Sequence, residues 1–169
     1  MGFDVGEIII YGSNGVCKIE DIREESFFKE APKKYYFLKP LFVKSTSVIY
    51  VPFDNPAQTD KIKPIMTSEE ADKFIEELPV KGMEWIDDRN RRKEKFMEIL
   101  SSGTRTEIAG IIHLISEHRK LLASEGKKLN AQDERALAES LNRINNELAV
   151  VKGMDPSEVE KHLISRVGT

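Results

Sequence analysis

The hydrophobic period of this sequence changes near residue 65, and this change limits what the chain can fold into. Before it, apolar residues gather in short runs rich in β-branched and aromatic side chains, such as Ile8–Tyr11, Tyr35–Leu38 and Val48–Val51. After it, apolar residues recur every three or four positions, which is the period of a helix that buries one face. A run of strands followed by a run of helices predicts an α+β protein of two domains, residues 1–64 and 65–169.

The first domain is expected to be a small antiparallel β-barrel. Asn14-Gly15 stands between the runs Ile8–Tyr11 and Val16–Ile22, and this dipeptide is the strongest short signal for a β-hairpin. Four or five short strands follow one another, separated by turn residues and without a helical segment between them. Such a series favours an antiparallel barrel over residues 1–64.

The second domain is predicted to be all α-helical, and capping residues mark where its helices begin. Thr67 and Thr104 each precede a glutamate by three positions, the pattern of a capping box. Asn130 is expected to cap a further helix, and Pro156 after Asp155 to open the last one. Glycines are expected just past three of the helix ends: Gly103, Gly126 and Gly153.

Composition excludes several classes of protein. The formal net charge is −3, so the chain is not a general nucleic-acid binder, and DNA contact would need a local basic patch or a tether. The longest stretch without Asp, Glu, Lys or Arg runs only from Ile8 to Cys17, short of the roughly 20 residues of a membrane-spanning helix. Cys17 is the single cysteine, which excludes an intramolecular disulfide and indicates a reducing cytoplasm.

No catalytic or metal-binding constellation stands out. His113 and Glu117 are four positions apart and could share a helix face, but two ligands without a third are weak evidence, and a surface histidine is the simpler interpretation. Cys17 lies in an expected strand and is best interpreted as a buried small hydrophobe. The prediction is a non-enzymatic protein with no catalytic residue, metal, cofactor or small-molecule substrate. A site assembled from scattered carboxylates is the alternative.

The segment from Trp85 to Phe96 departs from the general acidity. It contains the single tryptophan and, close behind it, five cationic side chains: Arg89, Arg91, Arg92, Lys93 and Lys95. On a helix, Arg89, Arg92 and Lys93 share a face, and such a face can meet phosphates across a groove. A tryptophan at the helix mouth, if exposed, could wedge against a base step.

Simpler interpretations of this segment stay open. A run of charges is usually a solvated helix face, and a lone tryptophan is usually partly buried in a core. Asp87 and Asp88 precede the cations; they could cap the helix, and they would also repel phosphate.

Three segments of the sequence carry a family resemblance. They are Phe3–Tyr11 with Asn14-Gly15-Val16 after it, Ile49–Asn55 with its Val51-Pro52 pair, and Trp85 ahead of a basic helix. In order and spacing they resemble the CarD/CdnL family of bacterial transcription regulators. The resemblance implies an N-terminal Tudor-like (SH3-like) barrel that binds the β subunit of RNA polymerase. It also implies a helical domain that contacts promoter DNA at the upstream edge of the transcription bubble.

In that family the tryptophan packs into the minor groove where duplex meets melted DNA, and the open complex is stabilised without sequence-specific recognition. By this resemblance the expected DNA contacts are Trp85, Arg89, Arg91, Arg92, Lys93 and Lys95, with Lys127 and Lys128 as a second patch. The expected contacts with the β subunit are Arg23, Tyr50, Val51 and Pro52. The expected location is the bacterial cytoplasm, in association with the nucleoid. The alternative is a protein–protein adaptor that never touches DNA, in which Trp85 would be buried.

Overall fold

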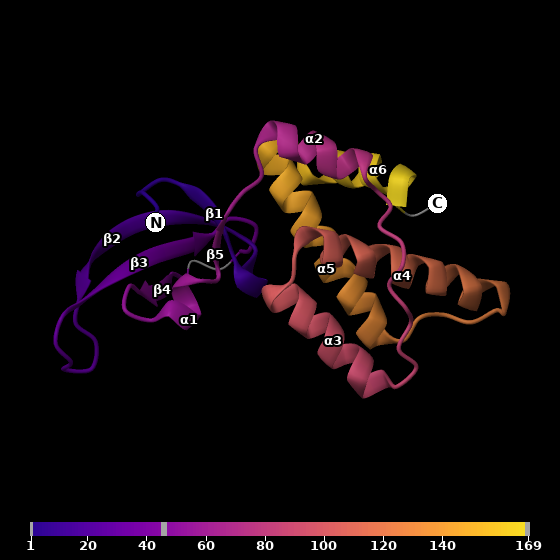
Figure 1. Cartoon of the computed structure of the whole chain (residues 1–169), viewed down its shortest axis with the longest axis horizontal. Helices are drawn as coiled ribbons and strands as arrows, with labels where there is room; N and C mark the ends of the chain where they lie inside the picture. Colours follow the sequence, from indigo (N-terminus) through magenta and orange to yellow (C-terminus); the bar gives the residue numbers. More distant parts are fainter. Residues whose placement is uncertain (1, 45–46, 168–169) are drawn as a thin grey trace. The chain divides into compact units, whose positions relative to one another are not determined.

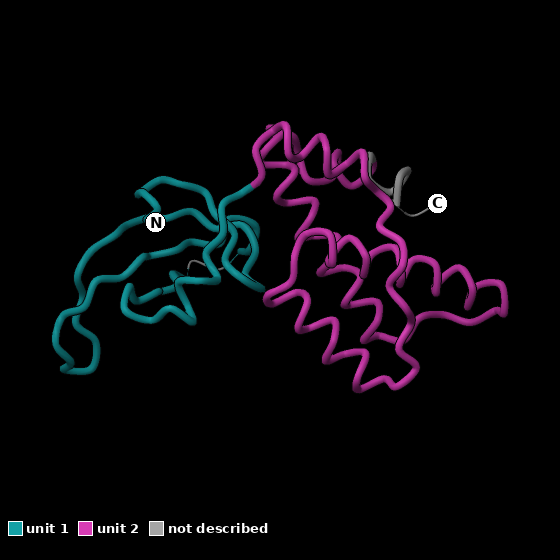
Figure 2. The backbone as a smooth tube through the Cα atoms, viewed as in Figure 1, with its two compact units in different colours: residues 1–65 teal, residues 66–169 magenta. Residues whose placement is uncertain are grey.

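The computed structural model describes residues 2–44 and 47–167, with side chains of the last helix described as far as Lys161. The chain forms two compact units, Met1–Ile65 and Met66–Thr169 (Figure 2). This division falls one residue after the boundary placed from the sequence. We call the units the sheet unit and the helical unit, and together they form the α+β arrangement expected from the change in hydrophobic period (Figure 1).

The sheet unit is built on five antiparallel strands in the order β4-β3-β2-β1-β5. The strands are β1 (Ile8–Tyr11), β2 (Val16–Glu25), β3 (Lys33–Pro40), β4 (Ile49–Pro52) and β5 (Ile62–Pro64). A 3-10 turn, η1 (Gly12–Asn14), joins β1 to β2, and a short helix, α1 (Pro56–Thr59), precedes β5. The hairpin expected at Asn14-Gly15 is confirmed, because Ile10 pairs with Val16 across it.

The sheet is open, which corrects the expectation of a closed barrel. Closure requires a ladder of hydrogen bonds between the first and last strands of the order. Over the described residues no ladder joins β4 to β5, and these two strands are only four and three residues long. Two edges therefore remain, one on each side of the sheet.

One face of the sheet carries the core of this unit. Strand alternation sends Ile9, Cys17, Ile19, Leu38 and Val51 to that face, where each is fully buried. Their neighbours along the strands, including Tyr50, point to the other face. This alternation decides which side chains of β4 are available to a partner.

The helical unit contains five described helices, as the capping signals predicted. They are α2 (Ser68–Glu76), α3 (Arg89–Ser102), α4 (Arg105–Ser124), α5 (Ala131–Lys152) and α6 (Pro156–Val167). Their apolar stripes meet in one core, whose centre includes Phe96, Ile111, Ile115, Ile144 and Leu148. Among the described helices, none combines the length and the apolar content that crossing a bilayer requires.

The predicted caps are present with their hydrogen bonds. Thr67 and Thr104 each accept a bond of 3.1 Å from the amide of the glutamate three residues later, and both capping boxes are complete. The Asn130 side chain accepts from the amide of Asp133 at 2.8 Å. Gly153 takes the left-handed conformation at the end of α5, with φ of 65°. Each cap of this kind typically stabilises a helix by about 1 kcal/mol.

Candidate functional site

Trp85 lies in the segment that leads into α3, and its indole ring is held by two neighbours. The imidazole of His118, from α4, stacks on it with ring centroids 3.6 Å apart and planes 11° from parallel. The guanidinium carbon of Arg92, from α3, lies 4.5 Å from the ring centroid. Trp85 also packs against the core of the helical unit while keeping part of its surface exposed. The indole is therefore neither free-standing nor sealed in the interior.

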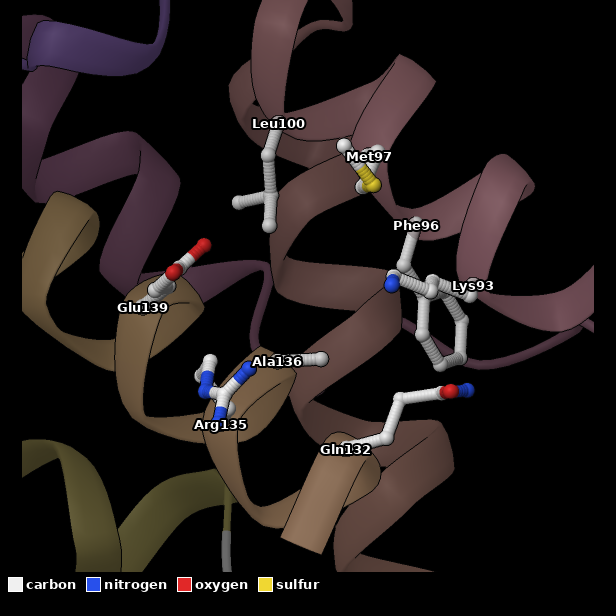
Figure 3. A pocket seen from close by; sticks show the side chains of 8 residues that line it. All are labelled: Lys93, Phe96, Met97, Leu100, Gln132, Arg135, Ala136 and Glu139. Carbon is white, nitrogen blue, oxygen red and sulfur yellow. The ribbon is translucent and has the colours of Figure 1, made fainter. Parts of the chain in front are cut away.

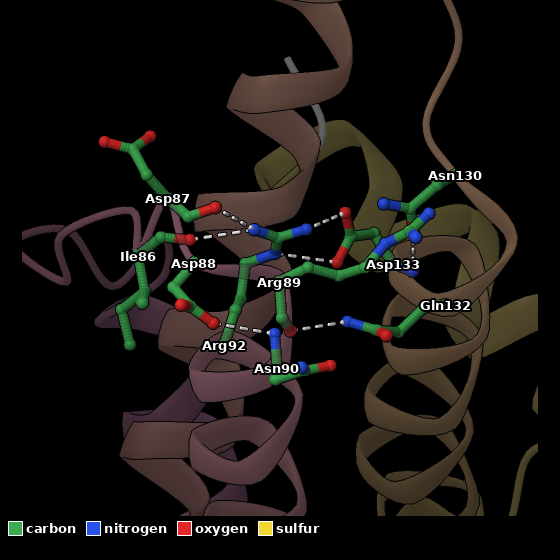
Figure 4. Close-up of polar contacts among 9 residues, drawn as sticks. All are labelled: Ile86, Asp87, Asp88, Arg89, Asn90, Arg92, Asn130, Gln132 and Asp133. Atoms are coloured by element: carbon green, nitrogen blue, oxygen red, sulfur yellow. Dashed lines mark hydrogen bonds and ion pairs between the residues drawn. The ribbon is translucent and has the colours of Figure 1, made fainter.

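Arg92 is an interior residue, with only 6% of its side chain exposed. Its Nε and Nη2 donate to the two carboxylate oxygens of Asp133, at 3.0 and 2.9 Å. Its Nη1 donates to the carbonyl oxygens of Ile86 and Asp87, at 2.8 and 3.3 Å (Figure 4). Every guanidinium nitrogen thus has a partner inside the protein, and none faces solvent toward a phosphate.

The phosphate contact predicted for Arg92 is therefore wrong for this structure. The reason is the position of the buried stripe on α3, because Arg92, Phe96 and Ile99 follow one another at spacings of four and three and are all buried. The face that sequence spacing assigned to Arg89, Arg92 and Lys93 is thus divided, with Arg92 inward and the other two exposed. Without knowledge of Asp133, the spacing alone did not reveal which cation turns inward.

Four predicted cations of α3 do face solvent. Arg89, Arg91, Lys93 and Lys95 are all exposed. Asp88 caps the helix by accepting from the amides of Asn90 and Arg91, both at 3.0 Å. The capping role foreseen for this aspartate is therefore confirmed. An exposed row of cations begins immediately after the segment that carries Trp85.

Lys127 and Lys128 are also exposed, in the turn between α4 and α5. Lys127 makes an ion pair of 3.6 Å with Glu125, a surface contact of the kind that contributes little to stability and can exchange partners. The turn leads into the start of α5, where Gln132 donates to the carbonyl oxygen of Arg89 at 3.0 Å. The beginnings of α3 and α5 are therefore bonded to each other.

A groove of about 230 Å³ runs between α3 and α5 (Figure 3). Its lining combines apolar side chains with polar ones: Lys93, Phe96, Met97, Leu100, Gln132, Arg135, Ala136 and Glu139. Arg135 is exposed and lines the same groove as Lys93 from the opposite helix. It is a cation that the sequence analysis missed, since nothing in the sequence pairs it with a residue on α3.

The sheet unit carries an aromatic cluster on the face opposite its core. Tyr50 is 47% exposed, and its ring centroid lies 5.0 Å from those of both Phe27 and Phe37. The guanidinium of Arg23 covers Phe37 at 3.9 Å. At the tip of the β2–β3 hairpin, Phe28 is 96% exposed with φ of 55°. The sequence analysis did not single out the two adjacent phenylalanines at this tip, although a turn is an unfavourable place for exposed aromatic rings.

Arg23 is exposed and bonded within its own strand. It donates to Asp21 at 2.5 Å and to Glu25 at 3.2 Å. The hydrogen bond from Arg23, with one from the Ile22 amide, lowers the pKa of the Asp21 carboxyl, which therefore stays ionised. Val51 contrasts with these residues because its side chain is fully buried. The prediction that the Val51 side chain contacts the β subunit is therefore wrong for this structure, and only the backbone of Val51 remains available to a partner.

The groups considered for catalysis lie in other surroundings. Cys17 is fully buried, which confirms its interpretation as a buried small hydrophobe. This burial raises the pKa of its thiol to about 11. Glu117 pairs with Lys120 at 3.2 Å. Among the side chains that the structure describes, those of residues 2–44 and 47–161, no group of three or more His, Cys, Asp or Glu is placed to hold a metal ion.

Two family descriptions match this chain, one for each unit. The model described as the CarD-like/TRCF RID domain matches residues 3–66. The model described as the CarD C-terminal domain matches residues 78–164.

The chain belongs to the CarD-like family. The resemblance drawn from the three sequence motifs is therefore confirmed. A comparison with curated proteins gave no match. As a CarD-like protein, the chain is an RNA polymerase-interacting transcription factor of the CarD/TRCF type. The CarD family domains are interaction domains without enzymatic activity.

Proposed function

We propose that this CarD-like protein binds the β subunit of RNA polymerase through its sheet unit and promoter DNA through its helical unit. The DNA contact is at the upstream edge of the bubble, does not depend on an operator sequence, and stabilises the open complex. The observation that carries the proposal is the partly exposed Trp85, held at the mouth of a helix whose Arg89, Arg91, Lys93 and Lys95 all face solvent. An adaptor without DNA contact predicts a sealed ring instead.

The chemistry of this surface suits DNA whose duplex is interrupted. Exposed arginine and lysine side chains attract phosphates regardless of sequence. An indole can pack against an unstacked base step. Trp85 and the exposed cations lie next to each other along the chain. The start of α3 can therefore meet both the phosphates and a base edge where duplex DNA meets melted DNA. Lys127, Lys128 and the newly found Arg135 are proposed to extend the cationic surface.

Weak DNA affinity is sufficient if the sheet unit is bound to polymerase. A tether raises the local concentration of a second module to the millimolar range, so a chain with a net charge of −3 can still engage DNA. A factor that binds the open promoter better than the closed one shifts the population toward open by its differential affinity. A wedge with two or three phosphate contacts is expected to supply about 1–3 kcal/mol.

The polymerase contact is proposed at the β4 edge and the aromatic cluster beside it. An edge strand has unpaired backbone groups that can hydrogen-bond to a strand of a partner, and β4 is such an edge. Tyr50 and Pro52 lie on β4 itself and would flank the added strand. Arg23 lies on β2, beyond β3, and would contact the partner from the aromatic face beside that edge. Aromatic and arginine side chains are the types that most often dominate protein–protein binding energy.

A salt titration tests the DNA contact. In the full chain, Arg89→Ala with Lys93→Ala should flatten the slope of log affinity for a forked promoter fragment against log salt by roughly two. Lys73→Ala with Lys161→Ala removes the same charge from exposed lysines of α2 and α6 and should leave the slope unchanged. An unchanged slope in the first variant, or an equal change in both, contradicts the assignment. Capture of the purified β subunit by the full chain tests the other contact.

A further inference from the structure

The single tryptophan is fixed on two sides by residues that the DNA contact itself does not require. His118 lies against a ring face at 3.6 Å, a distance at which two flat rings are in van der Waals contact. Arg92 approaches the same ring and is itself held by the buried carboxylate of Asp133. Neither residue was assigned a role toward Trp85 by the sequence, since 33 positions separate Trp85 from His118.

The bonds of Arg92 also fix the backbone beside the tryptophan. Its Nη1 donates to the carbonyl oxygens of Ile86 and Asp87, the two residues that directly follow Trp85. Asp133 is itself fixed in the first turn of α5, where its amide donates to the side chain of Asn130. Arg92 therefore cannot move without breaking its buried ion pair with Asp133. The segment is therefore held at its backbone by Arg92 and at its ring by His118.

We propose that His118 and Arg92 are positioning residues that hold the indole of Trp85 so that it meets DNA with its edge rather than with an open face. This rests on the proposed DNA contact of Trp85. A ring face covered by His118 cannot slide between two bases unless the stack is lost, whereas packing of a ring edge against a base step leaves the stack intact. Holding the ring in one orientation also removes part of the entropy that would otherwise be lost on binding.

Trp85 fluorescence tests the positioning directly, because no other tryptophan contributes to the signal. In the full-length protein, His118→Ala should increase quenching by acrylamide and lower the fluorescence anisotropy of the indole. His118→Phe should restore both, since a flat ring can stack in the same place. His118→Gln, which keeps a polar side chain but no ring, should behave like alanine and serves if the alanine variant does not fold. His113→Ala, on the same helix, is the matched control.

Promoter opening by polymerase with each variant tests what the positioning achieves. The His118→Ala protein should stabilise the open promoter about 2- to 10-fold less than wild type, because its indole loses orientational freedom on binding. The His118→Phe protein should recover the wild-type effect. Unchanged quenching and anisotropy in His118→Ala would overturn the positioning role, whatever the DNA result.

The remaining outcomes separate this inference from the proposed function. If quenching rises and Trp85→Ala abolishes the effect on opening, but His118→Ala opens promoters normally, the DNA contact stands and edge-on presentation is wrong. If quenching rises and Trp85→Ala also opens promoters normally, Trp85 does not serve DNA at all and both proposals fail at this site. The inference is supported if His118→Ala raises quenching, lowers anisotropy and weakens promoter opening, and if His118→Phe restores all three.

Discussion

The two units differ in whether they bury charged side chains. In the helical unit Arg92, Asp133 and Glu147 are buried, and Glu147 accepts bonds from the Met66 amide and from Arg105. In the described part of the sheet unit no Asp, Glu, Lys or Arg is buried, and the polar side-chain groups on buried residues are the hydroxyls of Tyr11 and Tyr36 and the Cys17 thiol. Arg23 bonds to Asp21 and Glu25 at the surface.

Both arginines lie over an aromatic ring, Arg92 over Trp85 and Arg23 over Phe37. The same arginine–aromatic contact therefore has a different role in each unit. A buried arginine with every nitrogen bonded defines the position of its neighbours, whereas an exposed arginine paired to surface carboxylates can exchange those partners for another protein. This difference explains why Arg92 is not available to a phosphate whereas Arg23 remains available to a partner.

The largest expected effect comes from breaking the interior pair. Arg92→Leu leaves the carboxylate of Asp133 buried without a partner, which typically costs about 3–5 kcal/mol. The midpoint of urea unfolding measures it. Arg92→Leu combined with Asp133→Leu should recover most of that loss, because no lone charge remains buried. Arg23→Ala is the counterpart in the sheet unit and should leave the midpoint unchanged. An equal loss in the two single variants would contradict the comparison.

Trp85→Ala should affect promoter opening more than folding. Because the ring is only partly buried, the loss of stability should fall below the roughly 3–5 kcal/mol of a core aromatic. The open complex should lose about 1–3 kcal/mol of stabilisation, or about 5- to 150-fold. Unfolding curves and promoter-opening assays on the same preparation give both values. A full core-sized stability loss with normal opening would favour the adaptor.

Substitution of exposed residues of the sheet unit should weaken binding to the polymerase β subunit without lowering the stability of the fold. Tyr50→Ala and Arg23→Ala should each weaken capture of the polymerase β subunit by about 10-fold, the scale of a moderately important interface residue. Calorimetric titration with the purified subunit measures the affinity. Glu24→Ala, an exposed position on the same strand as Arg23, provides the control and should bind normally.

The smallest effect concerns the thiol in the sheet interior. Because burial raises the pKa of Cys17 from about 9 to about 11, folding favours the neutral thiol. The stability that this contributes is fully present below pH 9 and is lost as the pH rises through 11. The urea midpoint of the wild type should therefore fall in that window, and the fall should be smaller in Cys17→Ala. Burial also raises the pKa of Tyr11, so some decline should persist in the variant.

Local features of this protein could be predicted from the sequence because their physical causes are local. The capping boxes at Thr67 and Thr104 depend on a bond between residues three apart, and the Asp88 cap depends on the next three residues. The hairpin at Asn14-Gly15 depends on the turn residues themselves. The three family motifs also lie along the chain, so they were visible without a fold.

The candidate site was predicted in composition but not in arrangement. The sequence indicated that Trp85 and five cations stand together, and four of those cations are exposed on α3. It did not indicate that Arg92 turns inward, because its partner Asp133 lies 41 positions away. Nor did it indicate that β4 and β5 do not pair with each other, since sheet closure depends on how two distant strands meet.

The sequence by itself therefore determined the order of the elements, where helices begin and end, and the family. These are consequences of hydrophobic period, backbone capping and turn chemistry, all of which act over a few residues. Only the tertiary structure decided that His118 and Arg92 hold Trp85, that Arg135 faces Lys93 across a groove, and that Tyr50 is exposed while Val51 is buried. Burial and long-range pairing are properties of the packed chain, and a side chain acquires its role only when its distant neighbours are in place.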